Sequence, residues 1–142
     1  MAVAVHPDDS RYQAHVGKKV RLPVAPAQRR THDGETLTPE IPVIADAILV
    51  DMAFGSGVVK VTPGHDFNDF ETGRRNHLPL VNTVHPDGRM NDNAGPLSGK
   101  TTDAARKEVL KLLTEAGLLR GEKDHTLSRG RCQRCDTVVE PL

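Results

Sequence analysis

The stretch FGSGVVKVTPGHDFNDFE, residues 54–71, carries the strongest structural signal of the chain. Its opening glycines are typical of a turn, the run VVKVT at 58–62 is typical of a short strand, and the Pro-Gly pair at 63–64 ends that strand. Asp66 and Asp69 then fall in the first turn of an expected helix, where carboxylates are favoured. The stretch therefore predicts a strand, a turn and a helix that gather polar side chains at one corner.

Four side chains at this corner are candidate catalytic groups. Because alternate residues of a strand share a face, Lys60 and Thr62 are expected on the same side of the sheet. Asp66 is a natural helix N-cap, and Asp69, three residues later, fits the pattern of a capping box. Capping and ligand binding are both open for these acids, and the neighbouring lysine and threonine favour binding. A carboxylate at a helix N-terminus is expected to be ionised, because the helix dipole stabilises negative charge.

Length and composition set broad limits on the function. The chain has 142 residues and a formal net charge of zero, which indicates one domain without a global field toward nucleic acid or membranes. Any contact with RNA has to come from local basic pairs, such as those at 18–19, 29–30 and 74–75. For each pair the simpler expectation is a solvent-exposed surface position without a partner. No apolar run approaches the ~20 residues of a membrane span, and no signal peptide is visible. We expect a cytoplasmic monomer without membrane contact.

The chain pattern predicts many short strands and two helices. Strands are expected at 2–5, 17–24 and 41–45, with Pro42 placing the last of these at a sheet edge. Asp33-Gly34 suits a hairpin turn. Because aromatic residues make up only 3% of the chain, the core has to be built mainly from Val, Leu, Ile and Ala.

The helices are expected at 66–76, with Phe67 and Phe70 on the buried side, and at 102–116, where the apolar residues repeat with helical spacing. A return strand starting at 118–119 is expected after them. Without regular alternation of strands and helices, this pattern predicts an α+β domain with a barrel-like β core and peripheral helices.

A histidine and a pair of cysteines are the remaining candidates. His65 is suited to act as a base or a ligand, although it lacks upstream residues at metal-ligand spacing. Cys132 and Cys135 supply half of a zinc site, which needs four ligands, and His125 is a conceivable third. We expect the cysteines to be reduced or an incomplete half-site, with no zinc or other cofactor in this domain. No Ser-His-Asp or Cys-His nucleophile is visible, which favours attack by a positioned water.

The chain resembles the editing domain of valyl-tRNA synthetases, which is inserted into the class I catalytic core. The resemblance rests on residues 54–71, on AVAVHPDD at 2–9 and on CQRCDTVVEPL at 132–142, and it covers almost the whole chain. The run KVTP at 60–63 and the ending VVEP favour the valyl type over the isoleucyl and leucyl types, which stay as alternatives.

This resemblance implies a function and a set of site residues. It implies hydrolysis of mischarged Thr-tRNA(Val), with Asp69 holding the α-ammonium group and Asp66 facing the threonine hydroxyl. The other matching positions are Lys60 and Thr62 in the catalytic set and Phe54 and His65 as substrate-binding residues. The implied partners are the 3′ end of tRNA(Val) and the rest of the synthetase chain, whose catalytic core uses ATP and Mg²⁺.

The resemblance also implies where the chain lies within the synthetase. Residues 1–142 are expected to be one editing-domain fragment, in which 128–142 begin the return to the synthetase core. A Thr-rich segment that walls the editing pocket in the family precedes the strand at 2–5 and is absent here, so the isolated fragment is expected to be weak or inactive. The alternative is a module that binds the tRNA 3′ end without hydrolysis.

Overall fold

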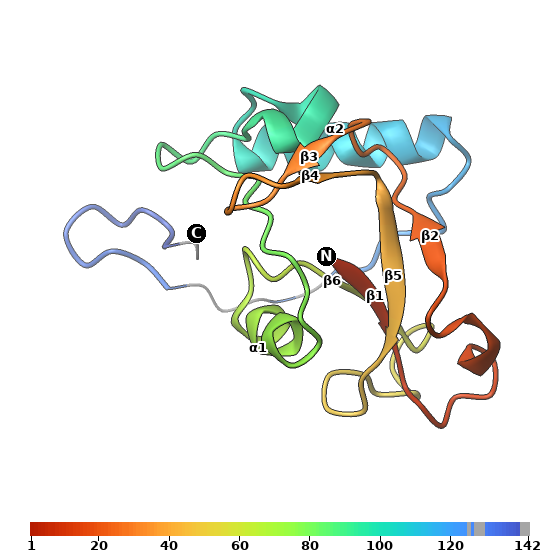
Figure 1. Cartoon of the computed structure of the whole chain (residues 1–142). Helices are drawn as coiled ribbons and strands as arrows, with labels where there is room; N and C mark the ends of the chain where they lie inside the picture. Colours follow the sequence, from red (N-terminus) through yellow and green to blue (C-terminus); the bar gives the residue numbers. More distant parts are fainter. Residues whose placement is uncertain (125, 127–129, 140–142) are drawn as a thin grey trace.

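The computed structural model describes residues 1–124, 126 and 130–139. Four strands form a mixed sheet in the order β2-β5-β1-β6, namely β1 (Ala2–Val5), β2 (Lys19–Arg21), β5 (Glu40–Ala45) and β6 (Val58–Val61). A separate hairpin consists of β3 (Arg29–Arg30) and β4 (Thr36–Leu37). The helices are α1 (Phe67–Arg75), α2 (Thr102–Glu115) and two 3-10 helices, η1 (Gln13–His15) and η2 (Asp92–Leu97). Figure 1 shows α1 at one end of the molecule and α2 with η2 at the other.

The α+β class is confirmed, but the expectation of a barrel is wrong. The sheet is open, with β2 and β6 as its edges, and the described residues form no closed barrel. Its central strand β5 pairs with β2 through residues 40–42 and with β1 through residues 43–45, so the neighbouring strands cover different halves of it. Strands this short and staggered leave too few paired residues for the sheet to curl onto itself.

Two strand expectations also fail in detail. Only Lys19–Arg21 of the expected strand 17–24 forms a strand, although backbone hydrogen bonds to the β5 segment also include Gly17, Lys18 and Leu22. The strand cannot continue to Val24, which has a φ of 60°, outside the β region. Pro42 does not lie on an edge strand, since β5 is internal. The missing N–H group is tolerated because pairing with β1 begins only at Val43.

The core is made of small aliphatic side chains. Two buried clusters are present, one of Ala2, Ala4, Val50 and Val61 and one of Met1, Ile41 and Val81. The phenylalanines are outside it: Phe67 is 77% exposed and Phe70 is 45% exposed, so the expectation that they form the buried side of α1 is wrong.

Instead, α1 buries Thr72 and Gly73. A Cβ atom at Gly73 would lie 2.7 Å from Cγ of Pro63, so this close packing of α1 on the turn depends on glycine.

A buried carboxylate fixes the far end of α1. Asp46, in the turn after β5, accepts hydrogen bonds from the backbone N–H groups of Ile48 and Leu49, at 3.0 and 2.9 Å. It also accepts from Nη2 of Arg75 at 2.9 Å and from Nδ2 of Asn76 at 3.1 Å. Arg75, expected on a solvated surface, is therefore half-buried in an ion pair that positions the helix.

The remaining local expectations have mixed outcomes. The helix at 102–116 is confirmed, with the hydroxyl of Thr101 accepting from Ala104 N and Gly117 leaving the helix at a φ of 69°. The hairpin turn at Asp33-Gly34 is confirmed by the pairing of β3 with β4. Residues 118–124 form no strand. No helix in the described part of the chain is long and apolar enough to cross a membrane.

Candidate active site

The end of β6 and the start of α1 form the expected polar corner. Asp66 is the N-cap of α1, and its Oδ1 accepts from the N–H groups of Asn68 and Asp69 at 2.8 and 3.0 Å. Asp69 does not complete a capping box. Its Oδ2 accepts from the backbone N–H of Thr62 at 2.6 Å, which ties the helix to the end of the strand. Capping therefore accounts for Asp66, while Asp69 makes a bond between two elements.

Lys60 extends this corner. Its Nζ donates a hydrogen bond to Oγ1 of Thr62, so Lys60, Thr62 and Asp69 form one connected group. Burial raises the pKa of Asp69, as does the Asp66 carboxylate, while the Thr62 N–H group and Lys60 oppose that rise. The pKa of Asp69 thus lies above its ordinary value, and the helix dipole does not decide it alone.

The surroundings shift the pKa of Lys60 as well. Its side chain is accessible through an open cavity, yet the dense protein around it lowers its pKa by desolvation, which Asp69 opposes and Arg29 reinforces. A lysine whose ammonium form is less favoured than usual gives up its proton more readily. The pKa of Asp69 is therefore raised and that of Lys60 lowered, so the two values lie closer together than those of isolated side chains.

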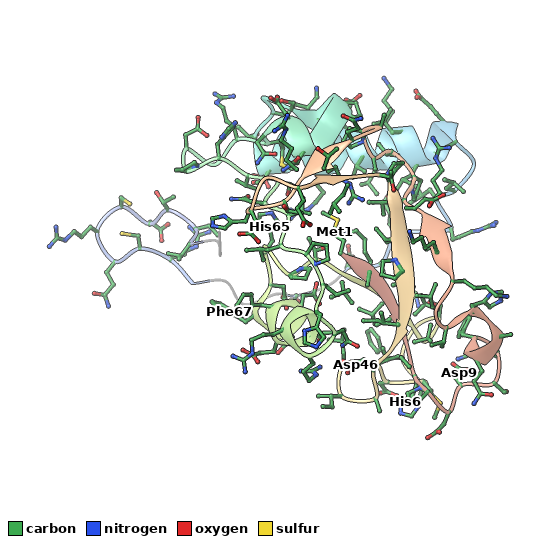
Figure 2. All side chains as sticks on the ribbon, in the orientation of Figure 1. Met1, His6, Asp9, Asp46, His65 and Phe67 are labelled. Atoms are coloured by element: carbon green, nitrogen blue, oxygen red, sulfur yellow. The ribbon has the colours of Figure 1, made fainter. Side chains whose placement is uncertain are left out.

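His65 connects the corner to a distant segment. Its Nε2 accepts from the backbone N–H of Thr83 at 2.9 Å and lies 2.8 Å from the Thr83 hydroxyl. In Figure 2 the label of His65 lies between α1 and the β3–β4 hairpin. Because Nε2 is occupied as an acceptor, this nitrogen holds the loop at Thr83 in the present geometry. The predicted contact of His65 with substrate stays a prediction.

Phe54 lies away from the other candidates. It precedes β6, whereas Thr62 follows it, so the two residues flank opposite ends of the strand. The ring is 76% exposed and lines a different cavity, together with Gly55, Ser56 and residues 120–124. The structure therefore brings Lys60, Thr62 and Asp69 together and leaves Phe54 apart.

A cavity of about 310 Å³ opens beside Lys60 and Thr62. Asp69 does not line this cavity, but its carboxylate accepts a hydrogen bond from the backbone N–H of Thr62, which does. The lining also includes Arg29, which was expected on a solvated surface and is only 2% exposed, so that expectation is wrong. Arg29 and Arg30 form the two-residue strand β3, so their side chains point to opposite faces. Nothing in the sequence indicates which of these faces is buried.

The two cysteines lie in a tight turn. Cys132 N donates to Thr137 O and Asp136 N donates to Cys132 O, both at 2.9 Å. Both thiols are free, and hydrogen bonds to Thr137 and then to Cys132 lower the pKa of Cys135. Within the described residues no three His, Cys, Asp or Glu side chains cluster as a metal site requires, and His125 lies outside those residues.

Purified protein is expected to hold less than one zinc ion per chain. Two thiolates fill only half of the four positions that structural zinc requires. Elemental analysis after dialysis without chelator measures this directly, with a Cys132→Ser, Cys135→Ser double variant as the control. One zinc per chain, absent from the double variant, contradicts the prediction and calls for a search for the other two ligands.

Fold and site together define a small α+β domain in which a lysine, a threonine and an aspartate meet beside a cavity. No protein-family model matches the chain. The chain is, however, homologous to a segment of valine–tRNA ligase. It is 51% identical over 141 residues to that of a Dehalococcoides mccartyi strain, 48% over 140 residues to that of Geobacter sulfurreducens and 45% over 141 residues to that of Aquifex aeolicus.

Each match covers 99% of this chain but only a small part of the relative. The chain spans 14% of the length of the first two of these relatives and 12% of the third. The resemblance to the valyl type is thereby confirmed, and it places the chain against one domain-sized segment of the larger proteins.

Proposed function

We propose that this chain is the hydrolytic editing domain of a valine–tRNA ligase and removes threonine from Thr-tRNA(Val). The observation that carries the proposal is the connected group of Lys60, Thr62 and Asp69 beside a cavity, in a chain homologous to that ligase. The editing role itself comes from the resemblance of residues 54–71 to editing domains.

The substrate poses a problem that such a site solves. Valine and threonine have nearly the same shape, and an apolar pocket cannot strongly reject the additional hydroxyl; the valyl enzyme is a known case. A second site can instead select for that hydroxyl. Asp69 would bind the α-ammonium group, and the Asp66 carboxylate would accept a hydrogen bond from the threonine hydroxyl. Valine would leave that acceptor unpaired, at a cost of roughly 1–3 kcal/mol.

The reaction needs no covalent intermediate. A water oxygen adds to the ester carbonyl and the bond to the terminal ribose oxygen breaks. The proton that the water gives up goes to that ribose oxygen, and threonine is released. Lys60 is suited to stabilise the negative charge that develops on the carbonyl oxygen, and Thr62, held by Lys60, to orient the water. Within a complete synthetase, ATP and Mg²⁺ would serve the separate aminoacylation site, and the protein would act as a cytoplasmic monomer.

One observation favours the second candidate, a module that binds the tRNA 3′ end without hydrolysis. Both acids already accept hydrogen bonds from backbone N–H groups, which is a sufficient structural role. Rates of deacylation of Thr-tRNA(Val) by the domain extended at its N-terminus with the Thr-rich segment of the family, measured beside the affinity for uncharged tRNA(Val), separate the two functions. Faster loss of threonine than in buffer supports editing, and binding without any acceleration supports the module. Val-tRNA(Ile) as a further substrate tests the isoleucyl type.

A further inference from the structure

The loop between Val50 and β6, residues 51–57, carries the Phe54 ring on an exposed surface and is called the Phe54 loop below. Its own hydrogen bonds are local: Phe54 N donates to Asp51 O at 3.2 Å, and Gly57 N donates to Phe54 O at 3.0 Å. Every residue from 51 to 56 is exposed, and 76% of Phe54 is accessible. Burial therefore does not fix the place of this ring, so contacts from another segment have to do so.

Two hydrogen bonds reach the Phe54 loop from the segment that follows β1. Nη2 of Arg11 donates to Met52 O at 3.4 Å. The Tyr12 hydroxyl donates to Ser56 O at 3.0 Å. The two acceptors lie two residues before and two residues after Phe54, so both flanks of the ring are attached. The guanidinium carbon of Arg11 also lies 5.2 Å from the centre of the Tyr12 ring, within range of a cation–π contact. Arg11 and Tyr12 therefore act on the loop together.

Arg11 is itself oriented by a buried carboxylate. Its Nε donates to Oδ1 of Asp9 at 2.8 Å, and its Nη2 donates to Oδ2 at 2.6 Å. Only 4% of the Asp9 side chain is exposed, against 54% of the Arg11 side chain. A planar guanidinium that binds a carboxylate at two points has a fixed orientation. The ion pair therefore aims Nη2 at the Phe54 loop instead of leaving the arginine free in solvent.

The loop comes closest to this ion pair at Gly57. A Cβ atom there would lie 2.7 Å from Nη2 of Arg11 and 3.1 Å from Oδ2 of Asp9, and φ is 74°. Gly55, in the same loop, also has a positive φ, of 59°, but a Cβ atom there would meet no atom of the described residues within 4 Å. Backbone conformation accounts for both glycines. The contact with the ion pair is what additionally requires Gly57 to have no side chain.

We propose that Arg11, oriented by Asp9, and Tyr12 are positioning residues that hold the Phe54 ring in place for the aminoacyl-tRNA substrate. The proposal rests on the proposed function in one respect, the role of Phe54 in substrate binding. A ring that is already in position loses little freedom when the substrate binds. Releasing the loop should therefore weaken substrate binding, which raises KM, and should leave the chemical step, which sets kcat, unchanged.

The variant Phe54→Trp reports on the mobility of the ring, because the chain has no Trp of its own. Its time-resolved fluorescence anisotropy is compared with and without Arg11→Met. The amplitude of the fast, nanosecond decay should grow about twofold or more when the loop is released, as the difference between a rigid and a flexible segment implies. Arg106→Met is the matched control, because Arg106 is 58% exposed and pairs with Asp103 on α2 at 3.6 Å. It should leave the decay unchanged.

Steady-state deacylation of Thr-tRNA(Val) by the domain extended with the Thr-rich segment tests the consequence for the substrate. Arg11→Met should raise KM about fivefold or more, the cost of ordering a side chain and its loop on binding, and change kcat less than about twofold. Gly57→Ala should also raise KM, because its Cβ atom would displace Nη2 of Arg11. In a Phe54→Ala background, Arg11→Met should have no further effect on KM, because the ring that it positions is gone. A purely structural loss would add to that of Phe54→Ala.

The outcomes separate this proposal from the proposed function. If the native extended domain binds tRNA(Val) without hydrolysing the ester, editing fails, and the affinity for tRNA(Val) takes the place of KM in the same comparison. If Arg11→Met does not fold, Tyr12→Phe, which removes one hydrogen bond, replaces it and should raise KM about twofold or more. An unchanged anisotropy decay or an unchanged KM in the folded variant, or an additive effect with Phe54→Ala, overturns the proposal. A native domain that neither binds tRNA(Val) nor hydrolyses the ester overturns both proposals.

Discussion

In the complete editing domain, replacing Asp69 with alanine is expected to slow hydrolysis of Thr-tRNA(Val) by about a hundredfold while the domain stays folded. In the proposed site this carboxylate holds the α-ammonium group of the substrate, and a hydrogen bond to a charged group contributes about 1.5–3 kcal/mol, equivalent to roughly 10- to 150-fold in rate. Single-turnover deacylation with saturating enzyme measures the change. The activity needs the ionised form of Asp69, so it should fall as the pH is lowered. Because the pKa of Asp69 is raised, this fall should begin at a higher pH than it would for an aspartate with the ordinary pKa.

The fold should survive because the N-cap of α1 is Asp66, which the substitution leaves intact. What is lost is one bond to Thr62 N, so the expected cost is about 1–2 kcal/mol of unfolding free energy. Asp69→Asn keeps an oxygen acceptor for that bond and removes the charge; it should be stable and equally slow. Glu71→Ala, on the exposed surface of the same helix, is the control. Near-normal hydrolysis by folded Asp69→Asn would show that the acid is only structural.

Replacing Asp46 with alanine is expected to lower the free energy of unfolding by about 3 kcal/mol. The reason is that the hydrogen-bond donors around this buried carboxylate would lose their acceptor. Asp46 accepts two backbone and two side-chain hydrogen bonds, and only 5% of its side chain is exposed. Urea unfolding followed by far-UV circular dichroism is suitable, because the chain has no Trp. Asp103→Ala, which removes an exposed ion pair at 3.6 Å, should cost less than about 0.5 kcal/mol.

The same residue predicts a pH dependence. Burial alone would raise the pKa of Asp46, but the bonds from Leu49, Arg75, Asn76 and Ile48 outweigh it and lower the pKa below the ordinary value of 3.8. The stabilising contribution is therefore fully present above the pKa of the unfolded chain and is lost as the pH falls through the folded one. The stability difference between the native protein and Asp46→Ala should shrink below about pH 4. A difference that stays constant down to pH 2 would assign the effect to something other than this carboxylate.

The sequence alone was sufficient where the signal is local. Asp66 and Thr101 cap the two helices and Gly117 ends the second, because a cap depends on a residue and its neighbours within one turn. The strands at β1 and β6 and the hairpin turn at Gly34 follow from alternation and turn chemistry in the same way. The pairing of Lys60 with Thr62 also followed, because residues two apart on a strand share a face.

Tertiary structure decided everything that depends on which face is covered. Periodicity put Phe67 and Phe70 on one side of α1, but the helix packs through Gly73 because the Pro63 ring lies against it. Arg29 and Arg30 are equivalent in the sequence, and only the docking of β3 on η2 buries one of them. Asp69 could have capped its own helix; instead the strand end offers it the N–H group of Thr62. A pattern along the chain shows which residues share a face, whereas the partner of that face comes from segments distant in sequence.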